Sequence, residues 1–318
     1  MDKILLDLRN KIENQLLPLV DNEYIVYGLP FYSNIGDVLI WEGARQLLKK
    51  SNQKCVGCYA SAVPIRKKLS SETIIIIMGG GFFGDVWRKA FECALANIDG
   101  KIENKIIFLP NSISYDDKIL LDHDIKFFSQ FKRLYMCFRD STSFQFASKN
   151  FINNVLLVPD MALYIDPSSI KDYAVPETRS ILYLQRTDHE ISGKESILGA
   201  EVHDWPTMDR LSFKMFFFKS LFKIYFILTS YPVLDFSFFT RLVNYIGEKY
   251  FRIYMLKTGV KFLSQYNSVI TTRLHPMILA YLLNKKVSFI DNSNHKILNL
   301  YDTWLRDVNN ISIYSYSD

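Results

Sequence analysis

The stretch Ser268-Val-Ile-Thr-Thr-Arg-Leu-His-Pro276 joins a β-branched run directly to a cation, an imidazole and a proline. Residues 268–272 predict a strand. The apolar run 276–283 predicts a helix with proline in its first turn, where the missing N–H is tolerated. Arg273 and His275 therefore stand at a strand-to-helix corner. Because open α/β sheets bind ligands beyond the carboxyl ends of their strands, and helix N-termini attract anions, the corner predicts a phosphate or carboxylate site.

Strands and helices alternate on both sides of this corner. The first part predicts strands at 24–29, 54–60, 73–78, 105–110, 133–138 and 155–158, and helices at 2–17, 37–50, 87–97, 117–130 and 141–149. The second part predicts strands at 180–185, 268–272 and 286–290, and helices at 252–265, 276–283 and 296–305. This βαβ repetition predicts an α/β fold with two Rossmann-like domains facing a central cleft. We place the domains at 1–172 and 173–318.

Composition narrows the class of protein. The chain has 318 residues, and its formal charge of +5 comes from 38 basic and 33 acidic residues spread too evenly to indicate nucleic-acid binding. The first residues alternate charged and aliphatic side chains, which does not fit a signal peptide, so we expect a cytoplasmic protein. Four cysteines do not form a disulfide framework, and Cys55 and Cys58 in a predicted strand are interpreted as ordinary thiols.

Further polar residues and glycines follow the predicted strands. They are Asn34, Gly36 and Asp37, of which Asp37 is predicted to cap a helix, then Gly79, Gly80, Gly81 and Asp85, and the cations Arg139 and Arg186. Arginines gathered at strand ends favour an anion site, because the guanidinium fork matches carboxylates and phosphates. The glycines fit neither a dinucleotide loop nor a Walker loop, so no nucleotide cofactor is predicted.

Histidine 275 is the favoured acid, since histidine titrates near neutral pH. The other histidines are His123, His189, His203 and His295. They lack the spacing of metal ligands, so no metal is predicted. Surface or packing roles are expected for them, with His189 a minor candidate because it closely follows Arg186.

Residues 211–239 differ in composition from the rest, with many aromatic residues and interleaved lysines. Lysines, Pro232 and Asp235 interrupt the segment too often for a helix that spans a membrane. Such a pattern is typical of a helix at a bilayer surface or on a lipid-linked substrate. The alternative is a core helix followed by a strand.

Several short motifs, in this order, resemble the polysaccharide pyruvyl transferase family from about residue 25 to 305, with a divergent gap at about 190–250. The motifs are Asn34-Ile-Gly-Asp37, Gly79-Gly-Gly-Phe-Phe-Gly-Asp85 with Trp87, Arg139-Asp-Ser141, Pro159-Asp160, Arg273-Leu-His275, Asp291-Asn-Ser-Asn-His-Lys296 and Tyr301-Asp-Thr-Trp304. Each motif is weakly specific alone, whereas their order and spacing together are specific.

The resemblance implies a fold like that of GT-B glycosyltransferases, phosphoenolpyruvate as donor and a sugar diol as acceptor. The product would be a pyruvate ketal, commonly a 4,6-ketal on a hexose such as galactose. By position, Arg139, Arg273 and His275 would form the donor site, with Lys296 nearby and Arg186 as a further donor-binding residue. The second domain would be the donor side, and Arg273 and His275 would be catalytic. The glycine loop would lie on the acceptor side. Arg88 stands near the place where family members often have a histidine, which leaves one role unassigned.

Two other functions fit the same sequence. A GT-B glycosyltransferase could hold the diphosphate of a nucleotide sugar between an arginine and a lysine. A non-catalytic component of a polysaccharide assembly complex could keep the fold without the reaction, because fold alone does not define function.

Overall fold

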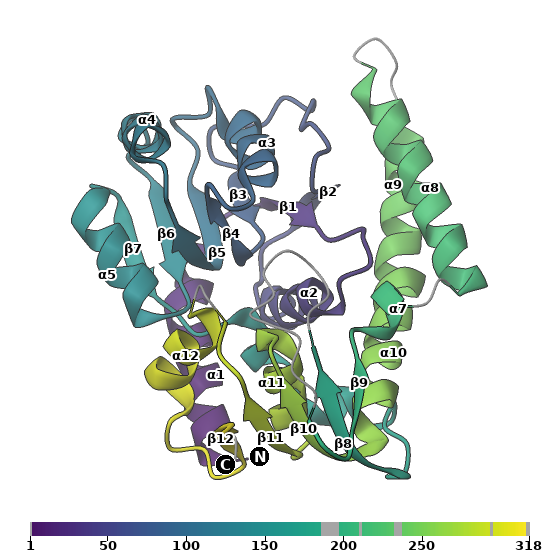
Figure 1. The fold of residues 1–318 in the computed structure, drawn as a ribbon. Helices are drawn as coiled ribbons and strands as arrows, with labels where there is room; N and C mark the ends of the chain where they lie inside the picture. The colour runs from purple at the N-terminus through teal and green to yellow at the C-terminus, as the bar shows by residue number, and fades with distance from the viewer. Residues whose placement is uncertain (1, 186–196, 210–211, 232–236, 293–294, 316–318) are drawn as a thin grey trace.

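The computed structural model describes residues 2–185, 197–209, 212–231, 237–292 and 295–315. It contains two parallel β-sheets (Figure 1). The first sheet has the strand order β2-β1-β3-β5-β6-β7. A seventh strand, β4, pairs with β5 and stands outside this order. Its strands are β1 (Tyr24–Leu29), β2 (Cys55–Ala60), β3 (Ile74–Ile77), β4 (Gly80–Gly84), β5 (Ile106–Ser114), β6 (Leu134–Phe138) and β7 (Asn154–Leu157).

The second sheet has the order β12-β11-β10-β8-β9. Its strands are β8 (Arg179–Leu184), β9 (Ala200–His203), β10 (Tyr266–Thr271), β11 (Lys286–Phe289) and β12 (Ile311–Ile313). In both sheets the first strand of the set lies between the second and the third, so the winding direction reverses there. Ligand crevices of open α/β sheets form at such reversals, between β1 and β3 in one sheet and between β8 and β10 in the other. The predicted α/β fold with parallel sheets is confirmed.

Helices connect the strands and cover the sheets. They are α1 (Lys3–Leu16), α2 (Ile35–Leu48), α3 (Arg88–Ile98), α4 (Lys118–Phe128), α5 (Ser141–Asn150), α6 (Pro167–Lys171), α7 (Pro206–Asp209), α8 (Phe213–Ser230), α9 (Ser237–Ile246), α10 (Arg252–Ser264), α11 (Leu274–Leu282) and α12 (Lys296–Leu300). Short 3-10 turns follow at Leu17–Leu19 (η1) and Met161–Tyr164 (η2), and π turns at Gly247–Phe251 (η3) and Tyr301–Leu305 (η4).

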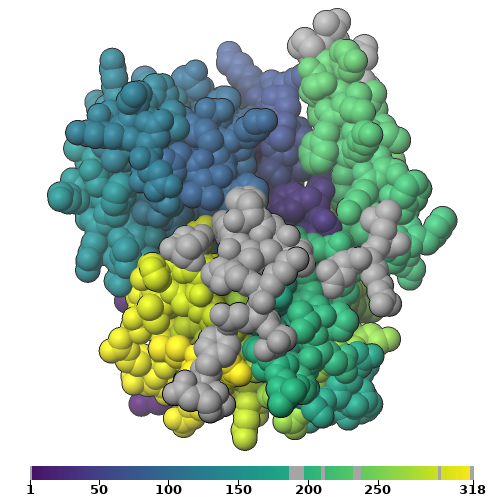
Figure 2. Space-filling view, in the orientation of Figure 1, coloured from purple at the N-terminus to yellow at the C-terminus, as the bar shows by residue number. Residues whose placement is uncertain are grey.

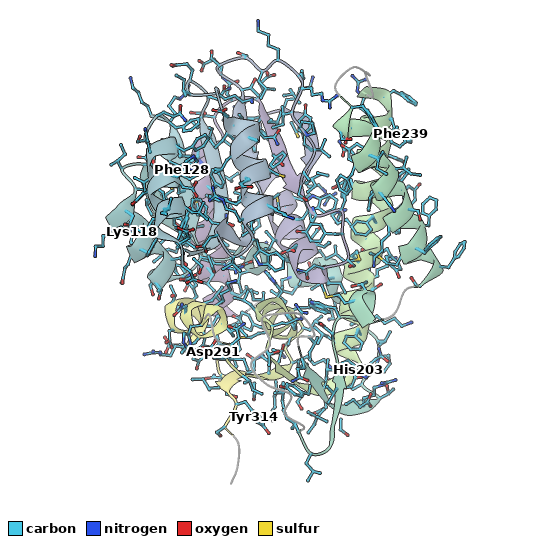
Figure 3. All side chains as sticks on the ribbon, turned by 45° about the horizontal axis from the view of Figure 1, so that its top comes forward. Lys118, Phe128, His203, Phe239, Asp291 and Tyr314 are labelled. Atoms are coloured by element: carbon cyan, nitrogen blue, oxygen red, sulfur yellow. The ribbon has the colours of Figure 1, made fainter. Side chains whose placement is uncertain are left out.

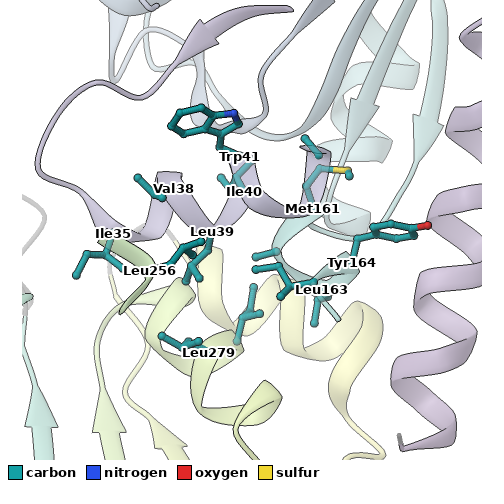
Figure 4. Packing of buried hydrophobic residues seen from close by; sticks show 14 of the residues in the cluster. Ile35, Val38, Leu39, Ile40, Trp41, Met161, Leu163, Tyr164, Leu256 and Leu279 are labelled. Carbon is teal, nitrogen blue, oxygen red and sulfur yellow. The ribbon is translucent and has the colours of Figure 1, made fainter. Parts of the chain in front are cut away.

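Helix α2 lies between the two sheets and is almost entirely buried (Figure 4). One continuous hydrophobic core includes Leu39 of this helix, Leu163 of η2 and Leu279 of α11. A β-carbon on Gly43 would lie 1.7 Å from the carbonyl oxygen of Met161, so the backbones of α2 and η2 touch at this glycine. The sequence-based boundary at 172 stays a prediction, since this core contains residues from both sides of it.

A buried ion pair also joins α2 to the second part of the chain. Arg252 at the start of α10 donates to the carboxylate of Glu42, and both side chains are only 7% exposed. The guanidinium also lies over the ring of Trp41, 5.9 Å from its centroid. Charges buried this far from water are stable only while they remain paired.

Three predictions differ from the structure. Helix α2 begins at Ile35 and not at Asp37, because Asn34 caps it by accepting a hydrogen bond from the N–H of Gly36. Helix α11 begins at Leu274, two residues before Pro276. The glycine loop forms strand β4, because β5 continues to Ser114 and offers a partner. At 211–239, α8 buries one face as the core-helix alternative expects, and a second helix, α9, that was not predicted begins at Ser237. The strand of that alternative would fall at 232–236, outside the described residues.

None of the helices within the described residues is long and apolar enough to cross a membrane. Helices α8 and α9 pack side by side at one edge of the molecule (Figures 1 and 2). Strand β2 holds Cys55 and Cys58 as free thiols with their sulfur atoms 3.6 Å apart.

Replacing Arg252 with methionine is expected to lower the free energy of unfolding by about 3 kcal/mol, because the Glu42 charge would remain buried without its main partner. Adding Glu42→Gln should recover part of this loss. Arg306→Met, at an exposed pair with Asp302, is the control and should leave the denaturation midpoint unchanged. Urea denaturation of the wild type, Arg252→Met, Glu42→Gln and the double variant measures the coupling between the two side chains. If the double variant lost as much free energy of unfolding as the two single variants together, the two side chains would not be coupled.

Candidate functional site

A cavity of about 400 Å³ lies at the carboxyl ends of both sheets. Residues after β1, β3 and β6 form one part of its wall, and residues after β9, β10 and β11 form the rest. The side chains that carry charge or hydrogen-bonding groups are Tyr27, Tyr32, Asn34, Asp37, Ser61, Trp87, Arg139, Trp205, Arg273, His275, Asn292 and Lys296. Nine of the lining residues were predicted from the sequence, namely Asn34, Asp37, Gly79, Gly80, Gly81, Arg139, Arg273, His275 and Lys296.

Arg139 follows β6 and is held by two neighbours that fix its direction. Its Nη1 donates to Asp160 Oδ2 at 2.8 Å, and its Nε donates to Ser112 Oγ at 2.9 Å. Arg139 is 3% exposed and Asp160 is fully buried. Nη2 has no hydrogen-bond partner among the described residues and lies next to Gly81. A β-carbon on Gly81 would lie 3.4 Å from this nitrogen.

Asp160 joins the arginine to the histidine of the corner. His275 Nε2 lies 3.6 Å from the same Oδ2 atom, which is longer than a normal hydrogen bond, while Oδ1 accepts a 2.8 Å bond from the N–H of Ala162. Burial raises the pKa of Asp160, but the imidazole of His275 and the guanidinium of Arg139 lower it by more. The pKa therefore lies well below its usual range. Asp160 therefore stays a carboxylate, and the guanidinium of Arg139 and the imidazole of His275 both face it.

The imidazole of His275 packs directly on the start of α2. A β-carbon on Gly36 would lie 2.6 Å from His275 Nδ1, so only glycine leaves room for the ring at this place. His275 itself lies in the first turn of α11. Its Nε2 is buried and has no hydrogen-bond partner among the residues that the structure describes. The ring is thus held between a helix backbone and the Asp160 carboxylate, at the wall of the cavity.

Arg273 has a buried carboxylate of its own. Its Nη2 donates to Asp204 Oδ2 at 2.6 Å, and the side chain of Asp204 is fully buried. Asp204 Oδ1 accepts from the N–H of Trp205, which lines the cavity. The N–H of Arg273 donates to Thr271 Oγ1 at 2.9 Å, so the corner is ordered on both sides. Asp204 orients the guanidinium at the cavity wall.

Lys296 starts α12 and brings a third permanent cation to the cavity. A β-carbon on Gly81 would lie 3.5 Å from Lys296 Nζ, at nearly the same distance as from Arg139 Nη2. Because Gly81 has no side chain, these two cations lie next to its backbone at the cavity wall. Asn292, which also lines the cavity, is 4% exposed, and its Oδ1 has no hydrogen-bond partner in the structure.

The motif Tyr301-Asp-Thr-Trp304 braces the Arg139 corner. Trp304 Nε1 donates to the carbonyl oxygen of Arg139 at 2.7 Å, and Thr303 Oγ1 accepts from the N–H of Ser141 at 3.0 Å. These bonds join the π turn η4 to the start of α5. The motif therefore positions Arg139 from outside the cavity.

The other sequence-predicted residues have structural partners. Asp37 lines the cavity and accepts a 2.8 Å bond from Asn34 Nδ2. Asp85 lies outside the cavity lining and accepts from the N–H groups of residues 116 and 117. Arg88 also lies outside it and pairs with Asp124 and Glu92. Gly79, Gly80 and Gly81 all line the cavity. Arg186 and His189 lie outside the described residues.

Sequence reasoning did not assign site roles to Asp160, Asp204, Ser112 or Asn292. Asp160 carried a signal, because it directly follows a strand end and stands in a motif. Asp204 carried none, since it lies in the divergent gap. No three His, Cys, Asp or Glu side chains come together as metal binding requires in the described part of the chain.

We expect Asp160→Asn to lower the free energy of unfolding by about 3–5 kcal/mol at neutral pH, because Arg139 would keep a buried, poorly compensated charge. The depressed pKa of Asp160 means that its contribution is present above the carboxyl's unfolded pKa and is lost as pH falls below about 4. The difference between wild type and variant should therefore shrink on acidification. Urea denaturation across pH measures it, and a difference that does not depend on pH would contradict the ionised carboxylate.

Comparisons with known proteins identify the family of the chain. The family model for "Polysaccharide pyruvyl transferase" matches residues 34–294. The chain is 30% identical to "Putative pyruvyl transferase EpsO" of Bacillus subtilis (strain 168), over 96% of this chain and 92% of that protein. It is 28% identical to "Pyruvyl transferase 1" of Schizosaccharomyces pombe (strain 972 / ATCC 24843), over 87% of this chain and 68% of that protein.

A crystal structure of an uncharacterized protein from Klebsiella pneumoniae subsp. pneumoniae NTUH-K2044 has the same fold. Its TM-score is 0.65 at 20% identity, over 99% of this chain and all of that chain. The family model spans most of the chain, and the resemblance found in the sequence is confirmed. The chain belongs to the polysaccharide pyruvyl transferase family.

Proposed function

We propose that the protein transfers pyruvate from phosphoenolpyruvate to two hydroxyl groups of a sugar, in the cytoplasm, during polysaccharide biosynthesis. The two sheets would then act as the two lobes of a GT-B-like cleft. The observation that carries the proposal is that Arg139 Nη2 and Lys296 Nζ both approach the cavity at Gly81, which has no side chain. The family supports pyruvyl transfer, and the cavity supports an anionic donor.

Phosphoenolpyruvate fits the charges of the cavity. Its phosphate carries about −1.5 to −2 charges and its carboxylate one more. Arg139, Arg273 and Lys296 together supply three permanent positive charges. Asp160 and Asp204 each accept a hydrogen bond from one of these arginines, which orients both guanidinium groups at the cavity wall. Buried guanidinium groups held in this way lose little side-chain entropy on binding, which favours a preformed anion clamp.

The opposite wall suits a sugar. Tyr27, Tyr32, Phe82 and Trp87 line it, and Asp37 is its only acidic side chain among the described lining residues. Aromatic rings offer apolar faces to the C–H groups of a hexose, and a carboxylate accepts hydrogen bonds from its hydroxyls. We assign this wall to the acceptor, a 4,6-diol of a hexose such as galactose, which is lipid-linked in this proposal.

The reaction needs one proton at the methylene carbon of phosphoenolpyruvate. In our scheme His275 donates it, and the cationic carbon that forms is attacked by the first sugar hydroxyl. The bond between this carbon and the phosphate oxygen then breaks, and the second hydroxyl closes the ketal. The two hydroxyl protons balance the proton delivered to carbon and the one taken by the departing phosphate. Arg139 and Lys296 stabilise the charge of that phosphate, as cations at a leaving group do.

We expect phosphoenolpyruvate alone to raise the melting temperature of the protein in a concentration-dependent way, since a ligand bound only to the native state stabilises it. Inorganic phosphate should be released only when a sugar with a free 4,6-diol is also present. A nucleotide sugar that raised the melting temperature in place of phosphoenolpyruvate would favour a glycosyltransferase. Phosphate release from neither mixture would favour a non-catalytic protein.

Gly81→Val is the matched variant for this binding test. The added side chain would fill the space between the two cations, so the thermal shift by phosphoenolpyruvate should be lost while the unliganded protein keeps its fold. Gly100→Ala is the control, because a β-carbon there meets nothing within 4 Å, although its positive φ of 70° adds local strain. An unchanged shift in Gly81→Val would place the donor elsewhere.

His275→Ala is expected to reduce kcat by about a hundredfold or more, as the loss of a general acid does, with a smaller change in KM. Arg273→Lys keeps a charge beside Asp204 but loses the guanidinium fork, so it should mainly raise KM. Steady-state phosphate release across pH measures both. If His275→Ala raised KM and kept the wild-type pH profile, the histidine would position Asp160 and Arg139 and would not be the acid.

A further inference from the structure

Helix α8 has two different apolar faces. Met215, Phe218, Phe222, Tyr225 and Thr229 recur at intervals of three or four residues and are buried against the body of the protein. A second set of apolar residues points away from it and is 48–86% exposed. That set is Phe213, Phe216, Phe217, Ile224 and Ile227. At 100° per residue these side chains cluster on the side of the helix opposite the buried one.

Helix α9, packed beside α8, adds to this exposed apolar surface. Phe238 is 79% exposed, and Leu242 and Tyr245 are about half exposed. Figure 3 shows side chains of both helices projecting outward at the edge of the molecule, far from the side marked by Lys118. A soluble protein seldom exposes so many large apolar side chains together unless something covers them.

The charges on the two helices have one sign. Lys214, Lys219, Lys223 and Arg241 are exposed, and neither α8 nor α9 contains an acidic residue. On the helical wheel Lys214 lies on one side of the exposed apolar strip, and Lys219 and Lys223 lie on the other. A second copy of the same surface would bring these like charges together. An anionic bilayer surface meets both features, because its phosphates attract the lysines and its interface accepts the aromatic rings.

The same helix supports the cavity. The ring of Phe31 stacks on Phe222 of α8 with centroids 4.5 Å apart, and its neighbours Pro30 and Tyr32 both line the cavity. Met208 of α7, shortly before α8, lines it as well. A surface bound through α8 would therefore lie near the wall that we assign to the acceptor.

We propose that α8 and α9 bind an anionic bilayer surface, with the exposed aromatic side chains at headgroup level and the lysines on lipid phosphates. This binding deepens the proposed function by presenting the cavity to a lipid-linked acceptor. The binding itself rests on the two helices alone, and only the delivery of the acceptor rests on the proposed reaction.

Flotation of the full chain through a density gradient tests the proposal. The protein should float with vesicles that contain phosphatidylglycerol, and high salt should release it. Lys219→Gln/Lys223→Gln should weaken partitioning about fivefold for each charge removed. Phe216→Gln/Phe217→Gln should weaken it as well. The control is Lys118→Gln/Ile119→Gln in α4, which removes an exposed lysine and an 80% exposed isoleucine and should float like wild type.

Three outcomes would overturn the proposal. One is a protein that stays at the bottom of the gradient with anionic vesicles. Another is equal flotation of the lysine variant and the wild type. The third is a dimer in solution that Phe216→Gln/Phe217→Gln dissociates, since a second copy would then cover the face. If the wild-type protein floated but released no phosphate from phosphoenolpyruvate and a diol sugar, the proposed reaction would be contradicted. The membrane binding would still be supported.

Discussion

One buried carboxylate, Asp160, lies beside side chains from both sets of elements. It accepts a hydrogen bond from Arg139, which follows a strand of the first sheet, and it faces His275, which starts a helix of the second. A buried carboxylate is stable only when it is compensated, so the arginine and the histidine must both remain at this place for the fold to be stable. The chemistry of the site and the stability of the fold therefore depend on the same group.

Two glycines let parts of the backbone come close to the side chains of the site. Gly36 lets the start of α2 touch the imidazole, and Gly81 leaves the space beside Arg139 and Lys296 open. The first contact holds the imidazole of His275 in one place, and the second keeps the cavity open beside two cations. Together with the brace from Trp304 to the carbonyl of Arg139, they build a site whose side chains are positioned before any substrate arrives.

The alternation of strands and helices could be predicted because buried parallel strands have apolar runs such as Ile74–Ile77, and because most helices begin near a capping residue. Strand ends also indicated Arg139, Arg273 and His275 correctly as neighbours in one cavity. Strand β4 could not be predicted, since it depends on β5 continuing past Pro110. The partners of the arginines could not be predicted either. Asp204 and Arg273 are far apart in sequence, and they meet because β9 and β10 lie on the two sides of β8.

The contacts of α2 also limit how the molecule can move. Its backbone touches the carbonyl of Met161 at Gly43, and its Ile35 would lie 2.8 Å from a β-carbon on Gly259 of α10. A hinge that opened one sheet relative to the other would have to separate these backbones and the buried pair of Glu42 and Arg252. We therefore expect substrates to enter and leave through small rearrangements of loops, with the two sheets moving as a single rigid body.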